Sequence, residues 1–133
     1  VYVNPMQEDL KEVLMKATNG IGPSVIIISA PARKAQEMAL DLAANQARIN
    51  FFGGLPKDDH LVSLDSNIIH YKELFIHGTS GTTSNHIHMC IELMAGKRVN
   101  ASQIISKVIS LEELPAMLVE AEKGNYLKIV VKP

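Results

Sequence analysis

Three apolar segments of the sequence end in small residues, and main-chain recognition of a ligand is the chemistry that such endings allow. The segments with their endings are VIIIS (25–29) before Ala30-Pro31, RINFF (48–52) before Gly53-Gly54-Leu55, and ELFIH (73–77) before Gly78-Thr79-Ser80-Gly81. Small residues leave backbone N–H and C=O groups accessible, so a flat polar ring can hydrogen-bond to them. Glycine also permits the positive φ of a tight turn. Both interpretations, ligand contact and simple strand termination, stay open.

A second loop, GTSGTTSNH, opens a helix with Thr82, Thr83 and Ser84. Free N–H groups and the helix dipole at such a position suit a phosphate. The sequence contains neither G-x-x-x-x-G-K-[ST] nor G-x-G-x-x-G. The composition of the loop therefore favours ordinary capping by a threonine or serine over a phosphate cradle.

The histidines and acidic residues do not form a convincing catalytic group. His86 and His88 are two apart on a predicted helix, so they point to different faces and make a poor metal pair. Asp58 and Asp59 are adjacent in a loop, which does not suit paired acid/base work. His77 precedes Gly78 and is the histidine that could stand near a ligand. We assign no catalytic residue and no metal ligand.

The single cysteine, Cys90, excludes an intrachain disulfide and a cysteine-cluster metal site. It lies among Ile87, Met89 and Ile91 in a predicted helix, which favours a buried structural thiol over a nucleophile. Low cysteine content is consistent with a cytoplasmic protein.

Composition limits the classes of partner. The 133 residues carry a net charge of −1, with 47% apolar and 20% charged residues. Scattered basic residues without interleaved aromatics argue against nucleic acid, and no apolar run is long enough to span a membrane. The sequence begins with VYVNP and without an initiating methionine, which indicates a fragment or a processed product.

The elements that must position these residues alternate between strand and helix. VYV (1–3) predicts a short strand, and Leu10, Val13, Leu14 and Ala17 predict a helix closed by Asn19-Gly20. The run VIIIS predicts a strand buried on both faces of a parallel sheet. Further strands are predicted at 48–52 and 73–77, separated by an amphipathic helix around Ala35–Ala43 and a helical turn near 67–71.

The chain changes composition near residue 82. A helix is predicted to end near Ala95-Gly96, followed by the strand KVIS, a helix over 111–123 and the strand YLKIVVK. Ser110 and Glu113 have capping-box spacing, and Pro115 can shift the start of that helix. The fold class is therefore α/β: a parallel sheet with flanking helices, followed by a small α+β tail.

The order of INFFGGLPKDD, HYKELFIHGTSG, ELMAGK and ISLEELPAMLVEAEKGNYLKIVVKP resembles the carboxyl-terminal part of medium-chain dehydrogenases, above all the zinc-containing alcohol, sorbitol and threonine dehydrogenases. The resemblance implies that residues 1–81 are the later part of a Rossmann domain that binds NAD or NADP. Residues 82–133 would connect to, and complete, the catalytic domain. The parent enzyme would be an NAD(P)-dependent alcohol or polyol dehydrogenase.

By the same resemblance, Gly53, Gly54 and Leu55 form a wall beside the nicotinamide ring. The backbone of Thr79 and Gly81 meets its carboxamide, and Ala30 and Pro31 lie near the bridge between adenosine and nicotinamide. The strand 73–77 corresponds to an edge through which members of the family form dimers. A small alcohol or polyol would be the substrate.

The resemblance also implies what these residues lack. The phosphate-binding glycine fingerprint and the zinc ligands of the family have no counterpart here, so the isolated chain is expected to be inactive. Two strands that separate VYV from VIIIS in the family are missing, and we predict that VYV pairs directly with VIIIS. The alternatives are a non-catalytic α/β module that binds nucleotide or phosphate or serves assembly, and a zinc-free reductase of the same superfamily.

Overall fold

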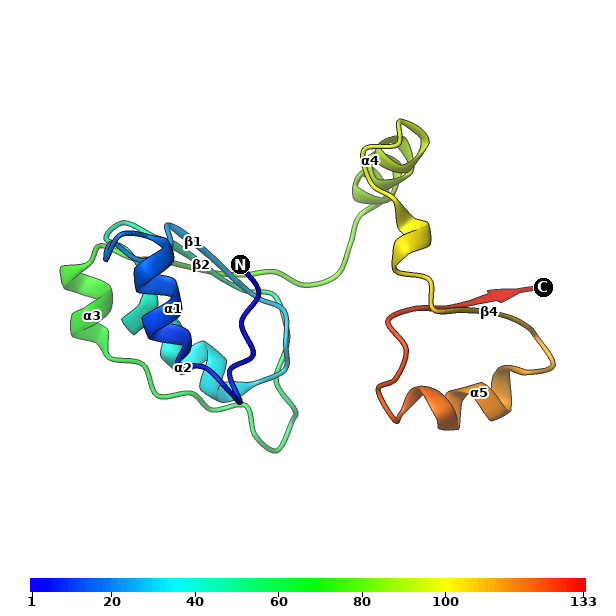
Figure 1. The fold of residues 1–133 in the computed structure, drawn as a ribbon, viewed down its shortest axis with the longest axis horizontal. Coiled ribbons are helices and arrows are strands. Elements are labelled where there is room, and N and C mark those ends of the chain that lie inside the picture. Colours follow the sequence, from blue (N-terminus) through cyan, green and yellow to red (C-terminus); the bar gives the residue numbers. More distant parts are fainter. The chain divides into compact units, whose positions relative to one another are not determined.

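The computed structural model describes all residues, 1–133, and the chain divides into two compact units (Figure 1). Unit 1 comprises residues 1–81 and unit 2 comprises residues 82–133. No helix combines the length and the apolar character needed to cross a membrane. The two units are described separately below.

Unit 1 is built on three parallel strands in the order β1-β2-β3, which confirms the predicted α/β class. The strands are β1 (Val25–Ile28), β2 (Arg48–Phe51) and β3 (Phe75–Gly78). The helices are α1 (Leu10–Ala17) before β1, α2 (Arg33–Leu42) between β1 and β2, and α3 (Ser66–Tyr71) between β2 and β3. Strand order follows chain order, so each helical connection brings the chain back to start the next parallel strand.

The core of unit 1 lies between the sheet and α2. Leu40 of α2 and Ile49 of β2 are its largest fully buried side chains, and Ala39 and Ala47 are buried beside them. The small alanines allow the helix backbone to approach the strands closely. This packing places α2 directly behind the sheet, where it can support the strand ends.

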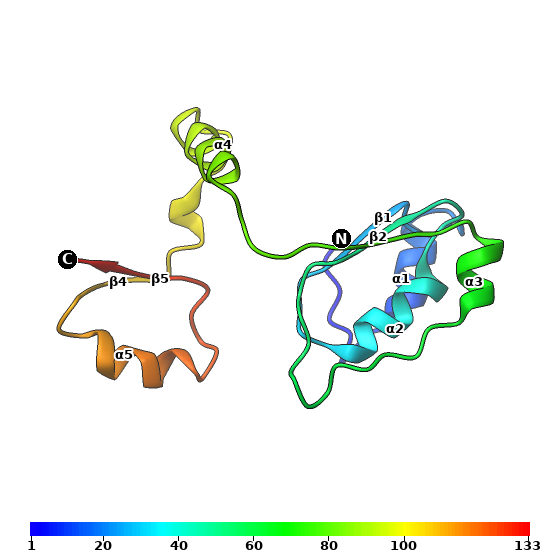
Figure 2. The same cartoon turned by 180° about the vertical axis from the view of Figure 1, so that it is seen from behind.

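The sheet of unit 1 is covered on one face only. Figures 1 and 2 both show α1, α2 and α3 on the same side of the strands. Side chains alternate across a strand, and Val25 and Ile27 on the opposite face are 58% and 62% exposed. The prediction that 25–29 is buried on both faces is therefore wrong for this chain, because its helices all pack on the other side.

The predicted strand at residues 1–3 is also wrong. These residues form no strand and do not pair with β1, and the side chains of Val1 and Tyr2 are fully exposed. Asn4 starts a turn at once: its backbone oxygen accepts from the N–H groups of Gln7 and Glu8 at 2.9 and 3.0 Å. Three residues ended by this turn are too few to form a stable ladder with a strand edge.

The predicted end of the first helix at Asn19-Gly20 is confirmed, and the structure adds the cap at its start. The carboxylate of Asp9 caps α1 by accepting from the N–H groups of Lys11 and Glu12 at 2.8 and 3.1 Å. Beyond the helix, Asn19 and Gly20 both take positive φ, 52° and 80°, which ends the helical path.

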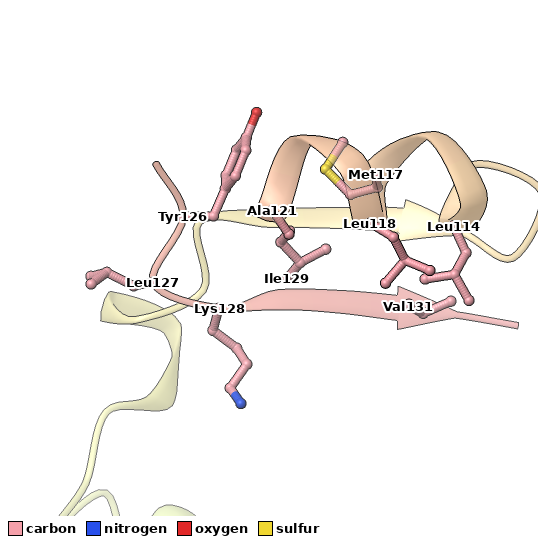
Figure 3. A pocket seen from close by; sticks show the side chains of 9 residues that line it. All are labelled: Leu114, Met117, Leu118, Ala121, Tyr126, Leu127, Lys128, Ile129 and Val131. Atoms are coloured by element: carbon pink, nitrogen blue, oxygen red, sulfur yellow. The ribbon is translucent and has the colours of Figure 1, made fainter. Parts of the chain in front are cut away.

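Unit 2 consists of α4 (Ser84–Ala95), a 3₁₀ turn (Ala101–Gln103), and a small β4-α5-β5 unit. The strands β4 (Lys107–Ser110) and β5 (Ile129–Lys132) are parallel, and α5 spans Leu114–Ala121. Figure 3 shows α5 standing over β5, with Leu114, Leu118, Ile129 and Val131 turned toward the space between them. The predicted α+β tail is thus present, with helix and strand shorter than expected.

Two sequence features explain where α5 begins. Pro115 occupies one of the first two helical positions, where its missing N–H leaves no internal bond unmade. The carboxylate of Glu113 accepts from the backbone N–H of Ser110 at 2.8 Å, which is half of the predicted capping box. The helix consequently starts at Leu114, three residues after the predicted position.

The prediction that Cys90 is buried is wrong. Cys90 is exposed on α4, and its neighbours Ile87, Met89 and Ile91 are 51%, 58% and 53% exposed. No residue of α4 is buried, so this largely apolar helix lacks a packing partner within unit 2.

Candidate functional site

The three strand ends with small residues lie side by side. Ile28, Phe51 and Gly78 are paired in register across the parallel sheet, so the segments that follow them leave the sheet at the same edge. We call these segments, 29–31, 53–55 and 79–81, the rim. In open parallel sheets a ligand binds beyond the carboxyl ends of the strands, which is the location of the rim.

Gly53 is needed by the fold itself. A Cβ atom at this position would lie 2.7 Å from the carbonyl oxygen of Ser29 and 2.9 Å from both the carbonyl carbon and the oxygen of Ala30. All three are backbone atoms that cannot move aside as the end of a side chain can, so a larger residue would push the first two rim segments apart. The close approach that excludes a side chain at Gly53 therefore comes from the protein backbone and not from a ligand.

The polar groups of Gly53 are also occupied. Its N–H donates to the carbonyl oxygen of Ile28 at 2.7 Å, and its own carbonyl oxygen accepts from Nε2 of Gln36 at 3.2 Å. Both bonds hold the exit of β2 against its neighbours. Gly53 thus positions the rim and has little hydrogen-bonding capacity left for a ligand.

Gly54 and Leu55 have the opposite character. The space beside Gly54 is open, since a Cβ atom there would meet nothing within 4 Å. The N–H groups of Gly54 and Leu55 donate to no protein group. Gly54 is exposed and Leu55 is half-buried. This pair offers main-chain donors together with an apolar side chain, which is what a planar heteroaromatic ring would use.

The third rim segment is fixed to β2 by two contacts. The N–H of Thr79 donates to the carbonyl oxygen of Phe51 at 3.4 Å, and the hydroxyl of Thr79 donates to Oδ1 of Asn50 at 3.2 Å. Gly81 has a φ of +69° with open space around it, a conformation that strains other residues. Ser80 and Gly81 are exposed, and the backbone N–H groups of these two residues have no protein partner.

The first rim segment offers less to a ligand. Ala30 and Pro31 are exposed, but the carbonyl oxygen of Ala30 accepts from the N–H of Ala32 at 2.8 Å as the chain turns into α2. Proline has no N–H to donate. The structure therefore brings all seven predicted residues to one edge, while their main-chain availability is greatest at Gly54, Leu55 and Gly81.

The predicted capping of α4 is confirmed. The hydroxyl of Thr83 accepts from the N–H of His86, and Nδ1 of His86 accepts from the N–H of Thr83, both at 3.4 Å. Two backbone donors that a phosphate would use are thus already engaged.

The histidine and acidic side chains do not come together in one group. His77 is exposed on β3 and lies in register with Asn50 of β2. Asp59 pairs with Arg33 at 3.2 Å, which ties the loop after the rim to the start of α2, and both side chains are at least half exposed. No three His, Cys, Asp or Glu side chains come together as a possible metal site.

Two hollows of the structure lie away from the rim. One of about 430 Å³ lies beside α2 and is lined by residues such as Glu37, Asp41 and Ile68. The other, of about 320 Å³, lies between α5 and β5 (Figure 3). Neither is lined by a residue of the rim.

Sequence reasoning missed Gln36 and Asn50, the two side chains that hold the rim. Gln36 is buried, in line with Ala39, Leu40 and Ala43 on the core-facing stripe of α2. A polar residue on an otherwise apolar stripe was the signal that could have found it. Asn50 carried no comparable signal, because polar residues alternate with apolar ones on any half-exposed strand.

Comparison with known proteins gives a consistent family. Residues 1–96 match the family model described as zinc-binding dehydrogenase. An uncharacterized zinc-type alcohol dehydrogenase-like protein of Haemophilus influenzae is 33% identical over 129 residues, covering 96% of this chain and 36% of that protein. The mannitol-1-phosphate 5-dehydrogenase of Aliivibrio fischeri is 28% identical over 116 residues, covering 86% of this chain and 27% of the enzyme.

Solved structures with a similar fold also include a dehydrogenase. A zinc-binding dehydrogenase of Sinorhizobium meliloti, bound to NADP, superimposes with a TM-score of 0.88 at 23% identity. The superposition covers 98% of this chain and 38% of that structure. The chain thus spans between 27% and 38% of the length of these relatives.

Proposed function

The chain belongs to the family of zinc-binding dehydrogenases, and from this premise we propose that it is the nicotinamide-side portion of an NAD(P)-dependent alcohol or polyol dehydrogenase. Residues 1–81 are the later part of the NAD(P)-binding Rossmann domain in this proposal. Residues 82–133 connect to the catalytic domain and supply its carboxyl-terminal part. The related mannitol-1-phosphate 5-dehydrogenase and the NADP-bound structure support this assignment.

The observation that carries the proposal is the contrast between the adjacent glycines. Gly53 is packed against Ala30, whereas Gly54 faces open space with a free N–H, at the carboxyl edge of a parallel sheet. A wall of this kind accepts the flat face of a pyridine ring and offers donors to a carbonyl group on it.

Bound nicotinamide would supply the chemistry, because its ring accepts a hydride from the alcohol carbon. The residues of this chain would do the positioning. Gly54 and Leu55 limit the tilt of the ring, while the main chain at Thr79 and Gly81 meets the carboxamide. Holding the ring at one angle and distance is a large part of what an enzyme contributes to such a transfer.

The side chains of this chain do not fit a zinc site, since no group of three potential ligands exists. A catalytic zinc in the complete enzyme would need ligands from outside these 133 residues. By itself the chain should be inactive and should bind cofactor weakly, because the phosphate-binding glycine motif is absent.

The edge strand β3 is proposed to mediate a homodimer. It has a partner on one side only, and Phe75 on it is 49% exposed. A strand edge left open in this way pairs readily with a second copy. The surrounding compartment is proposed to be the cytoplasm.

Titration of the isotope-labelled chain with NADH and NADPH tests the proposal by NMR. The amides of Gly54, Leu55 and Gly81 should shift in a saturable way, at millimolar concentration or below. Inorganic phosphate and nicotinamide mononucleotide serve as controls for the two ends of the cofactor. Shifts centred on Thr82–Ser84, produced equally by phosphate, would instead favour a phosphate-binding module.

A further inference from the structure

Gln36 is the one buried polar side chain of the molecule, and its position calls for an explanation. It is 5% exposed and lies near the start of α2, on the face that packs against the sheet. Burial of a primary amide is unfavourable unless it is hydrogen-bonded, and an apolar residue would fill the same space. The side chain therefore has a role that its hydrogen bond should reveal.

The hydrogen bond runs to the rim. Nε2 of Gln36 donates to the carbonyl oxygen of Gly53 at 3.2 Å, across 17 positions of sequence. This oxygen belongs to the same peptide unit as the N–H of Gly54. All peptide bonds of the chain are trans, so the C=O and N–H of that planar unit point in opposite directions.

It follows that Gln36 sets the direction of the Gly54 donor. With the Gly53 oxygen turned toward the buried amide, the Gly54 N–H must point away from the Gln36 side chain, and it donates to no protein group. Two consecutive glycines form an unusually flexible segment, and their shared peptide could rotate easily without such an anchor. The preceding peptide is already held by the bond from Gly53 N–H to Ile28.

We propose that Gln36 is a positioning residue that aims the Gly54 N–H at an acceptor oxygen of the bound ligand. The identity of that oxygen rests on the proposed function: it is the carboxamide oxygen of nicotinamide, the group that the main chain at Thr79 and Gly81 also meets. The orientation of the peptide does not rest on that function. An aimed donor loses less entropy on binding than a mobile one, so Gln36 contributes to affinity without touching the ligand.

Gln36→Met tests this role, because methionine fills a similar volume without a donor. The matched control is Gln46→Met. Gln46 also uses its side-chain amide, donating to Glu73 at 2.6 Å, but it is exposed and precedes β2, at the opposite end of the strand. Both variants of the full 133-residue chain are compared with the unaltered protein in two measurements.

The first measurement is the residual dipolar coupling of the Gly54 N–H in weakly aligned, ligand-free protein, with Ile49 as an internal reference for the sheet. We expect Gln36→Met to change the Gly54 coupling while that of Ile49 stays the same, and Gln46→Met to change neither. An unchanged Gly54 coupling in Gln36→Met would overturn the inference, whatever the ligand proves to be.

The second measurement is the affinity for NADPH. Loss of the aimed donor should raise Kd about threefold to tenfold in Gln36→Met, the scale of one hydrogen bond, with Gln46→Met unaffected. Equal affinity of Gln36→Met and the unaltered chain would contradict a role in binding. If NADPH fails to shift Gly54 or Leu55 in the unaltered chain, the proposed function fails, and the coupling still decides the role of Gln36.

Gln36→Glu provides a second variant of the same shape. When ionised, its carboxylate would repel the carbonyl oxygen of Gly53, so at high pH the peptide should rotate further than in Gln36→Met, whereas at low pH the protonated carboxyl can donate to that oxygen in place of the amide. A side chain that only filled space would give the reverse order of effects on the Gly54 coupling.

Discussion

The ammonium group of Lys72 donates to the carbonyl oxygen of Ala43 at 2.9 Å, and this contact fastens the end of α2. The same nitrogen reaches the carbonyl oxygens of Leu40 and Asp41, each at 3.1 Å. All three protons of the lysine are thus directed at carbonyl groups that the last turn of a helix leaves unpaired. Because Lys72 directly follows α3, the contact links the connection before β3 to the helix that supports the rim.

Lys72→Met should destabilise unit 1 by about 1–3 kcal/mol, since it removes a charged donor from two part-buried carbonyls, one exposed carbonyl and the negative end of the helix dipole. Hydrogen exchange of the Ile49 amide measures this loss within unit 1 alone. Lys34→Met is the control, because Lys34 is an exposed residue of α2 without a hydrogen bond or ion pair. Equal exchange in both variants would show that the three contacts add nothing to stability.

The two rim glycines should respond differently to the same substitution. Gly53→Ala places a methyl group against the backbone of Ser29 and Ala30 and should destabilise unit 1 by about 1–3 kcal/mol. Gly54→Ala meets open space, and stability should change by only about 0.5 kcal/mol. Urea unfolding followed by circular dichroism measures both.

The importance of Gly54 should lie in cofactor binding and not in stability. In Gly54→Ala the fold stays intact, yet the added methyl group occupies the space where a ring would lie, so NADPH affinity should fall while stability does not. A Gly54→Ala chain that binds NADPH as well as the unaltered chain would rule out ring contact at this position.

The sequence predicted where the three strands end better than it predicted what covers them. Small residues after three β-branched or aromatic runs were enough to place 29–31, 53–55 and 79–81 at one edge, because parallel strands must end together. The sequence could not show why positions 53 and 54 are glycine. Adjacent identical letters gave no indication that Gly53 is packed against backbone and that Gly54 is free.

Two of the errors in the fold share one physical origin. The strand at 25–29 and Cys90 on α4 were predicted to be buried because their apolar sequences are typical of interior elements. Burial, however, depends on a partner layer, and the local pattern of one element cannot show whether the rest of the chain provides it. The missing strand at 1–3 has a local cause, since Asn4 starts a turn before a ladder can form.

The contact between Asn50 and Thr79 should couple β2 to the third rim segment. Thr79→Val removes the hydroxyl that donates to Oδ1 of Asn50 while keeping a β-branched side chain. With Asn50→Ala and the double variant, it completes a double-mutant cycle with an expected coupling of about 0.5–1 kcal/mol. Exchange of the Ile49 amide reports each free energy. Strictly additive effects would mean that this side-chain hydrogen bond adds nothing to stability.

The proposed dimer edge can be tested with one backbone donor. The N–H groups of Phe75 and Thr79 point to β2, donating to Ala47 and Phe51 at 2.9 and 3.4 Å. Alternation along the strand directs the N–H of Gly78 outward, where a second copy would accept it. Gly78→Pro removes this donor and spares the bonds to β2.

Sedimentation equilibrium should therefore show weaker self-association of the Gly78→Pro chain, by about two- to tenfold in the dimer dissociation constant for each lost hydrogen bond. Gly78→Ala is the matched control, because a Cβ atom at this position meets nothing within 4 Å and the N–H is retained. Exchange of the Ile49 amide verifies that the sheet is intact in both variants. A chain that dimerises equally well with proline at position 78 must use another surface, and β3 would then be an edge without a partner copy.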